Sequence, residues 1–186
     1  MPLTAPCKTI DFRTTDIYEE TVDLRKFRGR KVLLAFFRDA ACPFCNLRLY
    51  ELSRDYDALQ ASGLEVIAVF SSTKEEVKQF VARHPRPFTM LADPNLELYQ
   101  RYGIQHSGSA MLKAMLLHPL RIIRGMLKGG TGDMNNPHVK LVPADFLIAE
   151  NGEIRLAWYG RNTSDHIPMK VIKQFAGKPL FKAAVG

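Results

Sequence analysis

The clearest hydrophobic pattern in the chain is an unbroken apolar run over residues 32–37. A short run of this kind predicts a strand that is buried on both faces. After four residues of loop, apolar positions recur at helical spacing from Pro43 to Ala61, and Gly63 follows as a helix stop. A second apolar run, rich in β-branched residues, covers residues 64–70. The pattern therefore predicts a strand, a helix and a second strand in succession.

The same alternation of strands and helices continues through residue 101. Thr73 and Glu76 form a capping-box pattern that predicts a helix reaching about Arg83. Residues 88–91 form a short apolar run, and Asp93 with Pro94 begins a helical pattern that extends to about residue 101. Strands that alternate with helices favour right-handed crossovers and a largely parallel sheet.

The two ends of the chain carry weaker patterns. Residues 1–16 are rich in Pro and Thr, so we expect a loosely ordered segment, and residues 18–24 alternate as a short strand does. Near the other end, residues 146–149 and 153–159 flank a Glu-Asn-Gly turn and predict a hairpin. A final helix is expected from about residue 164 to residue 175.

Residues 107–140 break the pattern and read as a basic insertion with one or two short helices. Five basic residues and one acid lie between residues 106 and 140, a net charge of +4 out of +7 for the whole chain (Lys113, Arg121, Arg124, Lys128 and Lys140 against Asp133). The segment has no aromatic residue, which argues against a nucleic-acid partner. Three interpretations of its apolar stripe remain open: core packing, a homodimer contact, or membrane-surface contact through residues 107–128.

Composition narrows the class of protein. The chain has 186 residues, of which 46% are hydrophobic and 24% charged, as in an ordinary soluble globular protein. Neither a secretory signal nor an apolar run long enough to span a membrane is present, so we expect a cytoplasmic protein. Only three cysteines occur, two of them in a C-x-x-C pair, which indicates redox or metal chemistry rather than a disulfide framework.

The C-x-x-C pair, Cys42 and Cys45, lies where the first helix begins. Amide groups and the dipole of a helix N-terminus favour a thiolate and lower the pKa of a cysteine placed there. We expect Cys42, which precedes the helix and is better placed for solvent, to be the nucleophile, and Cys45 to resolve the mixed disulfide. Arg38 would lower the pKa of Cys42 and Asp39 would raise it, unless the two form a solvated ion pair.

Other interpretations of the pair are half a zinc site or two buried cysteines. A zinc site needs two further ligands at suitable spacing, whereas the five histidines are scattered and Cys7 stands alone. No metal or cofactor is therefore expected. Cys7 is interpreted as a bystander.

Two stretches resemble a known family. Residues 36–49 (FFRDAACPFCNLRL) are similar to the peroxiredoxin-like branch of the alkyl hydroperoxide reductase/thiol-specific antioxidant superfamily, in which a strand ending in Arg leads into Cys-Pro-Tyr/Phe-Cys-Asn-Leu. Residues 143–148, 159–162 and 165–168 look like the C-terminal half of that branch. The resemblance implies one thioredoxin-like α/β domain over residues 1–186, with a central mixed sheet flanked by helices and a helical insertion around 107–140.

The resemblance also implies roles for two residues far from the cysteines. Pro143 corresponds to a proline that is cis in thioredoxin-like proteins and whose neighbouring backbone docks the substrate. Arg161 resembles the arginine that peroxiredoxins direct at the peroxide-reducing site, although a surface arginine is an equally good interpretation. Asp165 is expected to start the last helix, and His166 to be partly exposed.

The implied function is thiol–disulfide redox chemistry. In the first hypothesis, Cys42 reduces a hydroperoxide, Cys45 resolves it, and a thioredoxin- or glutathione-type thiol restores the pair. The sequence departs from the family pattern in one respect that weakens this first hypothesis. Peroxiredoxins have Thr or Ser three residues before the reactive cysteine, where this chain has Asp39. The alternatives are a disulfide oxidoreductase without peroxidase activity, and a non-catalytic redox-sensing or membrane-surface module.

Overall fold

A six-stranded sheet forms the centre of the protein. The computed structural model describes residues 1–81, 86–104, 120, 123–124, 127 and 141–177. The sheet has the strand order β1-β8-β7-β4-β5-β6. Its strands are β1 (Cys7–Lys8), β4 (Lys31–Phe37), β5 (Leu64–Phe70), β6 (Thr89–Ala92), β7 (Ala144–Ile148) and β8 (Glu153–Tyr159). A separate two-stranded sheet pairs β2 (Arg13–Thr15) with β3 (Thr21–Asp23).

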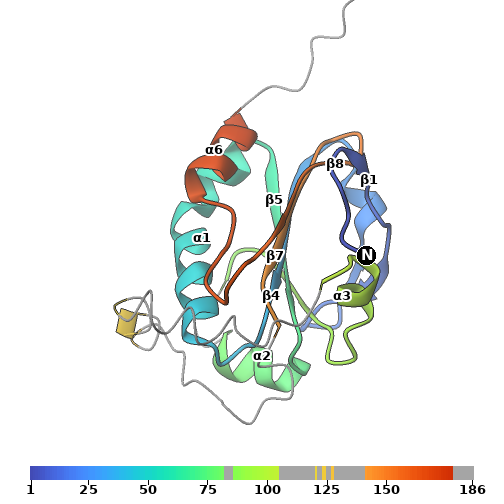
Figure 1. Ribbon diagram of the computed structural model, residues 1–186. Helices are drawn as coiled ribbons and strands as arrows, with labels where there is room; N and C mark the ends of the chain where they lie inside the picture. Colours follow the sequence, from blue (N-terminus) through green and yellow to red (C-terminus); the bar gives the residue numbers. More distant parts are fainter. Residues whose placement is uncertain (82–85, 105–119, 121–122, 125–126, 128–140, 178–186) are drawn as a thin grey trace, which may run out of the picture.

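Helices cover both faces of the large sheet. The α-helices with defined bounds are α1 (Pro43–Ala61), α2 (Lys74–Phe80), α3 (Glu97–Arg101) and α6 (Met169–Gly177), and a 3-10 helix spans Leu24–Phe27. Figure 1 shows α1 and α6 on one side of the sheet and α3 on the other. The described residues therefore form three layers, helix, sheet and helix.

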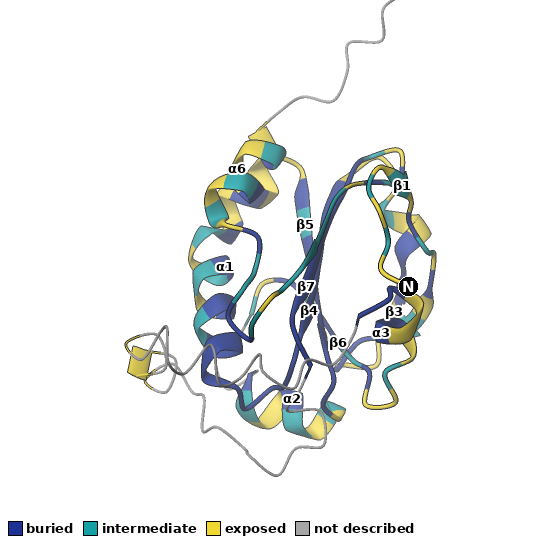
Figure 2. Ribbon diagram, viewed as in Figure 1, coloured by how far each residue is buried: buried dark blue, intermediate teal, exposed yellow. Residues whose placement is uncertain are grey.

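The central strand β4 contributes to both layers of core. All seven of its residues are buried (Figure 2), and the apolar run over residues 32–37 predicts this for all but Lys31. Residues 33, 35 and 37 join the core that contains the inward side chains of α1, whereas residues 32, 34 and 36 join the core that contains α3. This division follows from the two-residue period of a strand.

Strand directions bring several loops to one edge of the sheet. β4, β5 and β6 are parallel, so their C-terminal ends lie at the same edge. β7 is antiparallel to β4, with Phe36 opposite Ala144, so the start of β7 lies at that edge too. Residues 38–42, 71–72 and 143 are consequently neighbours, although they are far apart in the sequence.

The bounds of α1 agree with the sequence pattern, whereas α2 ends at Phe80 rather than about residue 83, α3 begins at Glu97 rather than at residues 93–94, and α6 also begins late. α1 has the predicted bounds, and Thr73 and Glu76 form the predicted capping box of α2. α6 begins at Met169 rather than near residue 164. The physical reason is Pro168, because a proline disfavours the helical conformation of the residue before it and is itself favoured in the first turn.

Residues 1–16 are not the loosely ordered segment that their composition suggested. β1 pairs with β8, with Cys7 opposite Ile154, and β2 pairs with β3. Pairing with a sheet edge is a long-range contact that composition cannot reveal. The predicted basic insertion over 107–140 lies largely outside the described residues, and its role stays a prediction. No helix among the described residues is long and apolar enough to cross a membrane.

Candidate active site

Cys42 and Cys45 lie at the start of α1, at the sheet edge described above. Cys42 is the N-cap residue of α1, and Cys45 lies in its first turn. Both are free thiols, with exposed fractions of 0% and 1%. The expectation that Cys42 is better placed for solvent is therefore wrong, since the loop and helix bury both side chains.

The pKa values of the two thiols are shifted in opposite directions. The pKa of Cys42 is lowered to about 6, mainly by a hydrogen bond from the Cys45 thiol. Burial raises this pKa, whereas the charge of Arg38, the backbone N–H of Cys45 and a hydrogen bond from Arg38 lower it further. Burial, followed by the hydrogen bond to Cys42, raises the pKa of Cys45. The proton is thus held on Cys45 and the negative charge on Cys42. This division is what an attacking and a resolving cysteine require.

Arg38 and Asp39 have different tasks. Arg38 is buried and donates a hydrogen bond to Cys42, so it belongs to the thiolate site and is not a solvated surface residue. The carboxylate of Asp39 accepts a hydrogen bond from the backbone N–H of Ala41 at 2.9 Å and lies 3.5 Å from the hydroxyl of Ser72. Asp39 therefore helps to hold the loop that carries Cys42.

Asn46, whose role the sequence pattern did not reveal, fixes the same loop from inside α1. Its side chain is fully buried, and its Nδ2 donates to the carbonyl of Ala40 at 2.7 Å and to that of Cys42 at 3.2 Å. The hydroxyl of Ser71 at the end of β5 donates to the carbonyl of Arg38. These bonds satisfy buried carbonyls of a segment that belongs to no helix or strand.

Two further side chains tie the loop to the neighbouring strands. The hydroxyl of Ser72 accepts from the backbone N–H of Ala40 at 3.0 Å. The hydroxyl of Tyr99 contacts the carbonyl of Phe37 and lies 3.1 Å from the carbonyl of Val69. Every one of these contacts spans many residues of sequence, so no local signal could have identified it.

Pro143 and Arg161 lie at the same edge, but only part of the expectation for them is met. The backbone N–H of Gly160 donates to the carbonyl of Pro143 at 2.8 Å, which places residues 160–161 beside Pro143. The prediction of a cis bond at Pro143 is wrong: the cis bond among the described residues is Ala5–Pro6. The reason is the ordinary preference of X–Pro bonds for trans, which suits the extended entry into β7. Arg161 is exposed, and its action on Cys42 stays a prediction.

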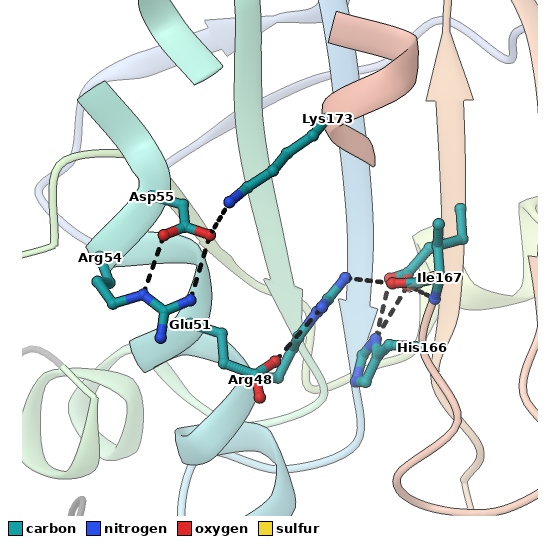
Figure 3. Close-up of polar contacts among 8 residues, drawn as sticks. Arg48, Glu51, Arg54, Asp55, His166, Ile167 and Lys173 are labelled. Atoms are coloured by element: carbon teal, nitrogen blue, oxygen red, sulfur yellow. Dashed lines mark hydrogen bonds and ion pairs between the residues drawn. The ribbon is translucent and has the colours of Figure 1, made fainter. Parts of the chain in front are cut away.

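A second polar cluster lies between α1 and the segment before α6. Figure 3 shows Arg48 reaching from α1 towards Ile167, beside the ring of His166. Asp145 of β7 accepts from the Nδ1 of His166 at 3.0 Å and from the backbone N–H of Ile167 at 2.7 Å. Arg48 donates to the carbonyl of Ile167 at 2.6 Å. Residues from α1, β7 and the segment before α6 thus meet in one buried polar cluster.

Burial and charge compete at Asp145. Burial pushes its pKa up, but the charge and hydrogen bond of His166, the charge of Arg48 and the N–H of Ile167 outweigh burial and bring the pKa below its usual value. The side chain of His166 is 5% exposed and packs on Phe37 with ring centroids 5.1 Å apart. His166 as a residue is partly exposed, as expected, although its side chain is buried. Asp165 accepts from the N–H of Arg161 rather than starting α6.

Metal chemistry has no support in the described part of the chain. Among those residues, no group of three or more His, Cys, Asp or Glu side chains lies close enough together to hold a metal ion. The half-zinc-site interpretation of Cys42 and Cys45 therefore lacks further ligands there.

Comparison with known proteins agrees with this geometry. A family model described as "AhpC/TSA family" matches residues 6–157, which is most of the chain. The chain belongs to this family. Peroxiredoxin Bcp of Escherichia coli is 28% identical over 112 residues, which are 60% of this chain and 72% of that protein. The thiol-disulfide oxidoreductase ResA of Halalkalibacterium halodurans is 29% identical over 99 residues, 53% of this chain and 56% of ResA.

Solved structures agree about the fold. PrxQ of Xylella fastidiosa superposes with a TM-score of 0.69 at 12% identity, covering 94% of this chain and 96% of that one. The predicted thioredoxin-like fold is thereby confirmed, while the family match and the curated relatives confirm the peroxiredoxin-like resemblance and the class of thiol-dependent oxidoreductase. The chain aligns with between 56% and 72% of the two curated relatives, and neither fixes its substrate.

Proposed function

We propose that this protein reduces hydroperoxides with Cys42 as nucleophile and Cys45 as resolving cysteine. The Cys42 thiolate attacks the terminal oxygen of the hydroperoxide, the O–O bond breaks, and the alkoxide or hydroxide leaves with a proton. Cys42 is then a sulfenic acid. The Cys45 thiol condenses with it to form a disulfide and water. Two electrons from a thiol donor restore both thiols.

The observation that carries this proposal is the opposite polarisation of the two thiols. Cys42 has a pKa of about 6 and is ionised at neutral pH, with Arg38 hydrogen-bonded to it. A guanidinium at this position supports the reaction further, because it stabilises negative charge that develops on the peroxide oxygens. Arg161, beside Pro143 at the same edge, is proposed to assist, with Pro143 shaping the backbone next to the substrate.

A disulfide oxidoreductase without peroxidase activity is the second candidate. Asp39 occupies the position three residues before Cys42, where peroxiredoxins have a hydroxyl that helps to hold the peroxide, so this position has no hydroxyl here. The similarity to ResA supports this candidate, and the same thiolate could attack a disulfide. Either way, we propose a cytoplasmic protein without metal or cofactor whose partner is a thioredoxin- or glutathione-type donor.

Hydroperoxide turnover with matched cysteine variants separates the candidates. We expect peroxide consumption coupled to a thiol donor to vanish in Cys42→Ser. Cys45→Ser should complete one turnover and accumulate a sulfenic acid that dimedone traps, whereas the control Cys7→Ser keeps full activity. Disulfide reduction that depends on Cys42 without peroxide consumption would establish the second candidate. If Cys42→Ser changes neither activity, the enzyme proposals are wrong, and liposome binding that depends on Arg121 and Arg124 would support the membrane-surface module.

A further inference from the structure

The loop between β4 and α1 makes a turn before it delivers Cys42. The backbone N–H of Cys42 donates to the carbonyl of Asp39 at 3.3 Å, the hydrogen bond that closes a β-turn over residues 39–42. Asp, Asn and Ser are favoured at the first position of such a turn, because their side chains accept from the backbone N–H two residues further on. The carboxylate of Asp39 makes this contact with Ala41 at 2.9 Å. Asp39 is therefore a residue type that suits this turn.

Asn46 holds the same stretch of chain from inside α1. Its Nδ2 donates to the carbonyls of Ala40 and Cys42, and its backbone N–H also donates to the carbonyl of Cys42, at 3.0 Å. The opposite orientation of the side-chain amide would set an oxygen against two carbonyl oxygens, so the network fixes this one. The Oδ1 of Asn46 is buried and has no hydrogen-bond partner among the described residues. A buried acceptor without a partner costs free energy, and the two bonds that Nδ2 donates offset that cost.

Asp39 and Asn46 together hold one peptide group and one residue at both ends. The carbonyl of Ala40 and the N–H of Ala41 belong to the same peptide group, and Asn46 holds the first while Asp39 holds the second. At Cys42, Asp39 accepts from the N–H and Asn46 donates to the carbonyl. Both holding residues are buried, so water does not replace these bonds. Rotation of either peptide group would therefore leave buried polar atoms without partners.

The fixed backbone decides which polar groups surround the Cys42 sulfur. Cys42 has φ −66° and ψ 125°, the extended conformation that an N-cap residue needs to direct its side chain at the free N–H groups of the helix. Those N–H groups stabilise an anion. The negative ends of the Ala40 and Cys42 carbonyl dipoles are directed at the Asn46 amide. A carbonyl that turned towards the sulfur instead would destabilise the thiolate.

We propose that Asp39 and Asn46 are positioning residues that hold the Cys42 sulfur at the N-terminus of α1, and that Asp39 does so as a hydrogen-bond acceptor and not through its charge. This inference rests on the proposed role of Cys42 as the nucleophile. It also accounts for the departure from the peroxiredoxin pattern at position 39. Ser and Thr hydroxyls make the same contact with the N–H two residues further on, but more weakly. Asp39 thus strengthens the turn that delivers the cysteine, at the loss of a hydroxyl.

Substitutions of Asp39 separate its acceptor role from its charge. The readout is the pKa of Cys42, taken from the pH dependence of thiolate absorbance in a Cys7→Ser background. Asp39→Ala should raise this pKa by about one unit, as loss of a bond that fixes the anion predicts. Asp39→Asn should keep it near the wild-type value, because the amide oxygen still accepts from Ala41. Asp39→Ser, with its weaker acceptor, should lie between the two. This variant keeps the test available if Asp39→Ala does not fold.

Substitutions of Asn46 test the other side of the loop by the same measurement. Asn46→Ala removes both Nδ2 bonds and should also raise the Cys42 pKa by about one unit. Asn46→Ser should raise it less, because a serine hydroxyl in a helix can donate to the carbonyl four residues before it, here that of Cys42. The serine side chain is too short to reach Ala40 as well. The two variants therefore separate the contact with Cys42 from the contact with Ala40.

The matched control is Ser53→Ala, measured together with urea unfolding of every variant. Ser53 also donates to a carbonyl of α1, that of Leu49 at 2.8 Å, but it lies further along the helix from the cysteine loop. Ser53→Ala should leave the Cys42 pKa unchanged. The proposal is wrong if either alanine variant of Asp39 or Asn46 folds, loses stability and keeps the wild-type pKa, because the contacts are then merely structural. It is also wrong if Asp39→Asn shifts the pKa as far as Asp39→Ala does. Since no peroxide is used, failure to reduce hydroperoxides would overturn the proposed function and leave these results intact.

Discussion

Removal of the Cys45 thiol should raise the pKa of Cys42. The hydrogen bond from Cys45 is the largest of the influences that lower this pKa to about 6, and burial acts against it. Cys45→Ala keeps the burial and Arg38 but deletes the thiol donor. We therefore expect the pKa of Cys42 in this variant to move up towards the ordinary thiol value.

The size of the effect follows from the thiolate fraction. With a pKa of about 6, Cys42 is roughly 90% thiolate at pH 7. Complete return to the ordinary value of about 8.5 would leave about 3% thiolate, a roughly 30-fold fall in the reactive fraction that corresponds to about 2 kcal/mol. Burial, which raises the pKa of Cys42, and Arg38 and the helix amide, which lower it, all remain in the variant and oppose one another.

Two measurements in a Cys7→Ser background report the result. Absorbance of the thiolate near 240 nm gives the pKa directly, and the rate of alkylation by iodoacetamide at pH 7 gives the reactive fraction. Cys45→Ser is the matched control, because its hydroxyl can still donate to Cys42. A Cys42 pKa that stays near 6 in Cys45→Ala would refute the reasoning, and Arg38→Met would then identify whether the guanidinium sets it instead.

Three further substitutions test the buried contacts around the site. Asp145→Asn should cost about 3 kcal/mol at pH 7 in urea unfolding, because it removes the buried carboxylate that pairs with His166 and accepts from the N–H of Ile167. Since the pKa of Asp145 is lowered on folding, its stabilisation is complete above the usual carboxyl pKa of about 4 and is lost as pH falls below it. Wild type should therefore lose more stability than the variant between pH 4 and 2, and parallel acid profiles would contradict this. Asn46→Ala deletes the bonds to Ala40 and Cys42 and should cost about 2 kcal/mol in the same measurement; an unchanged urea midpoint would exclude that role. Thr73→Ala removes the α2 cap and should lower thermal stability by about 1 kcal/mol, whereas Thr73→Ser should retain most of it.

Local patterns in the sequence were sufficient for the elements that carry the cysteines. The bounds of β5 and α1 could be predicted because the signals lie within the segments themselves: the spacing of the apolar residues, Pro43 at the start of the helix and Gly63 after its end. The position of Cys42 at a helix N-terminus, and the thiolate character that follows from it, depend on the same neighbouring residues. Membership of the AhpC/TSA family was visible in residues 36–49 for the same reason.

Tertiary structure alone decided how those thiols are buried and what surrounds them. The burial of Cys42, which we had expected to face solvent, results from packing of the loop between strands that only the fold brings together. Asp145, His166 and Arg48 come from three separate segments, and no spacing rule connects them. Side chains determine the bounds of the helix that carries them through neighbouring residues. A redox site also requires charges and hydrogen bonds from distant segments, and those contacts exist only after the chain has folded.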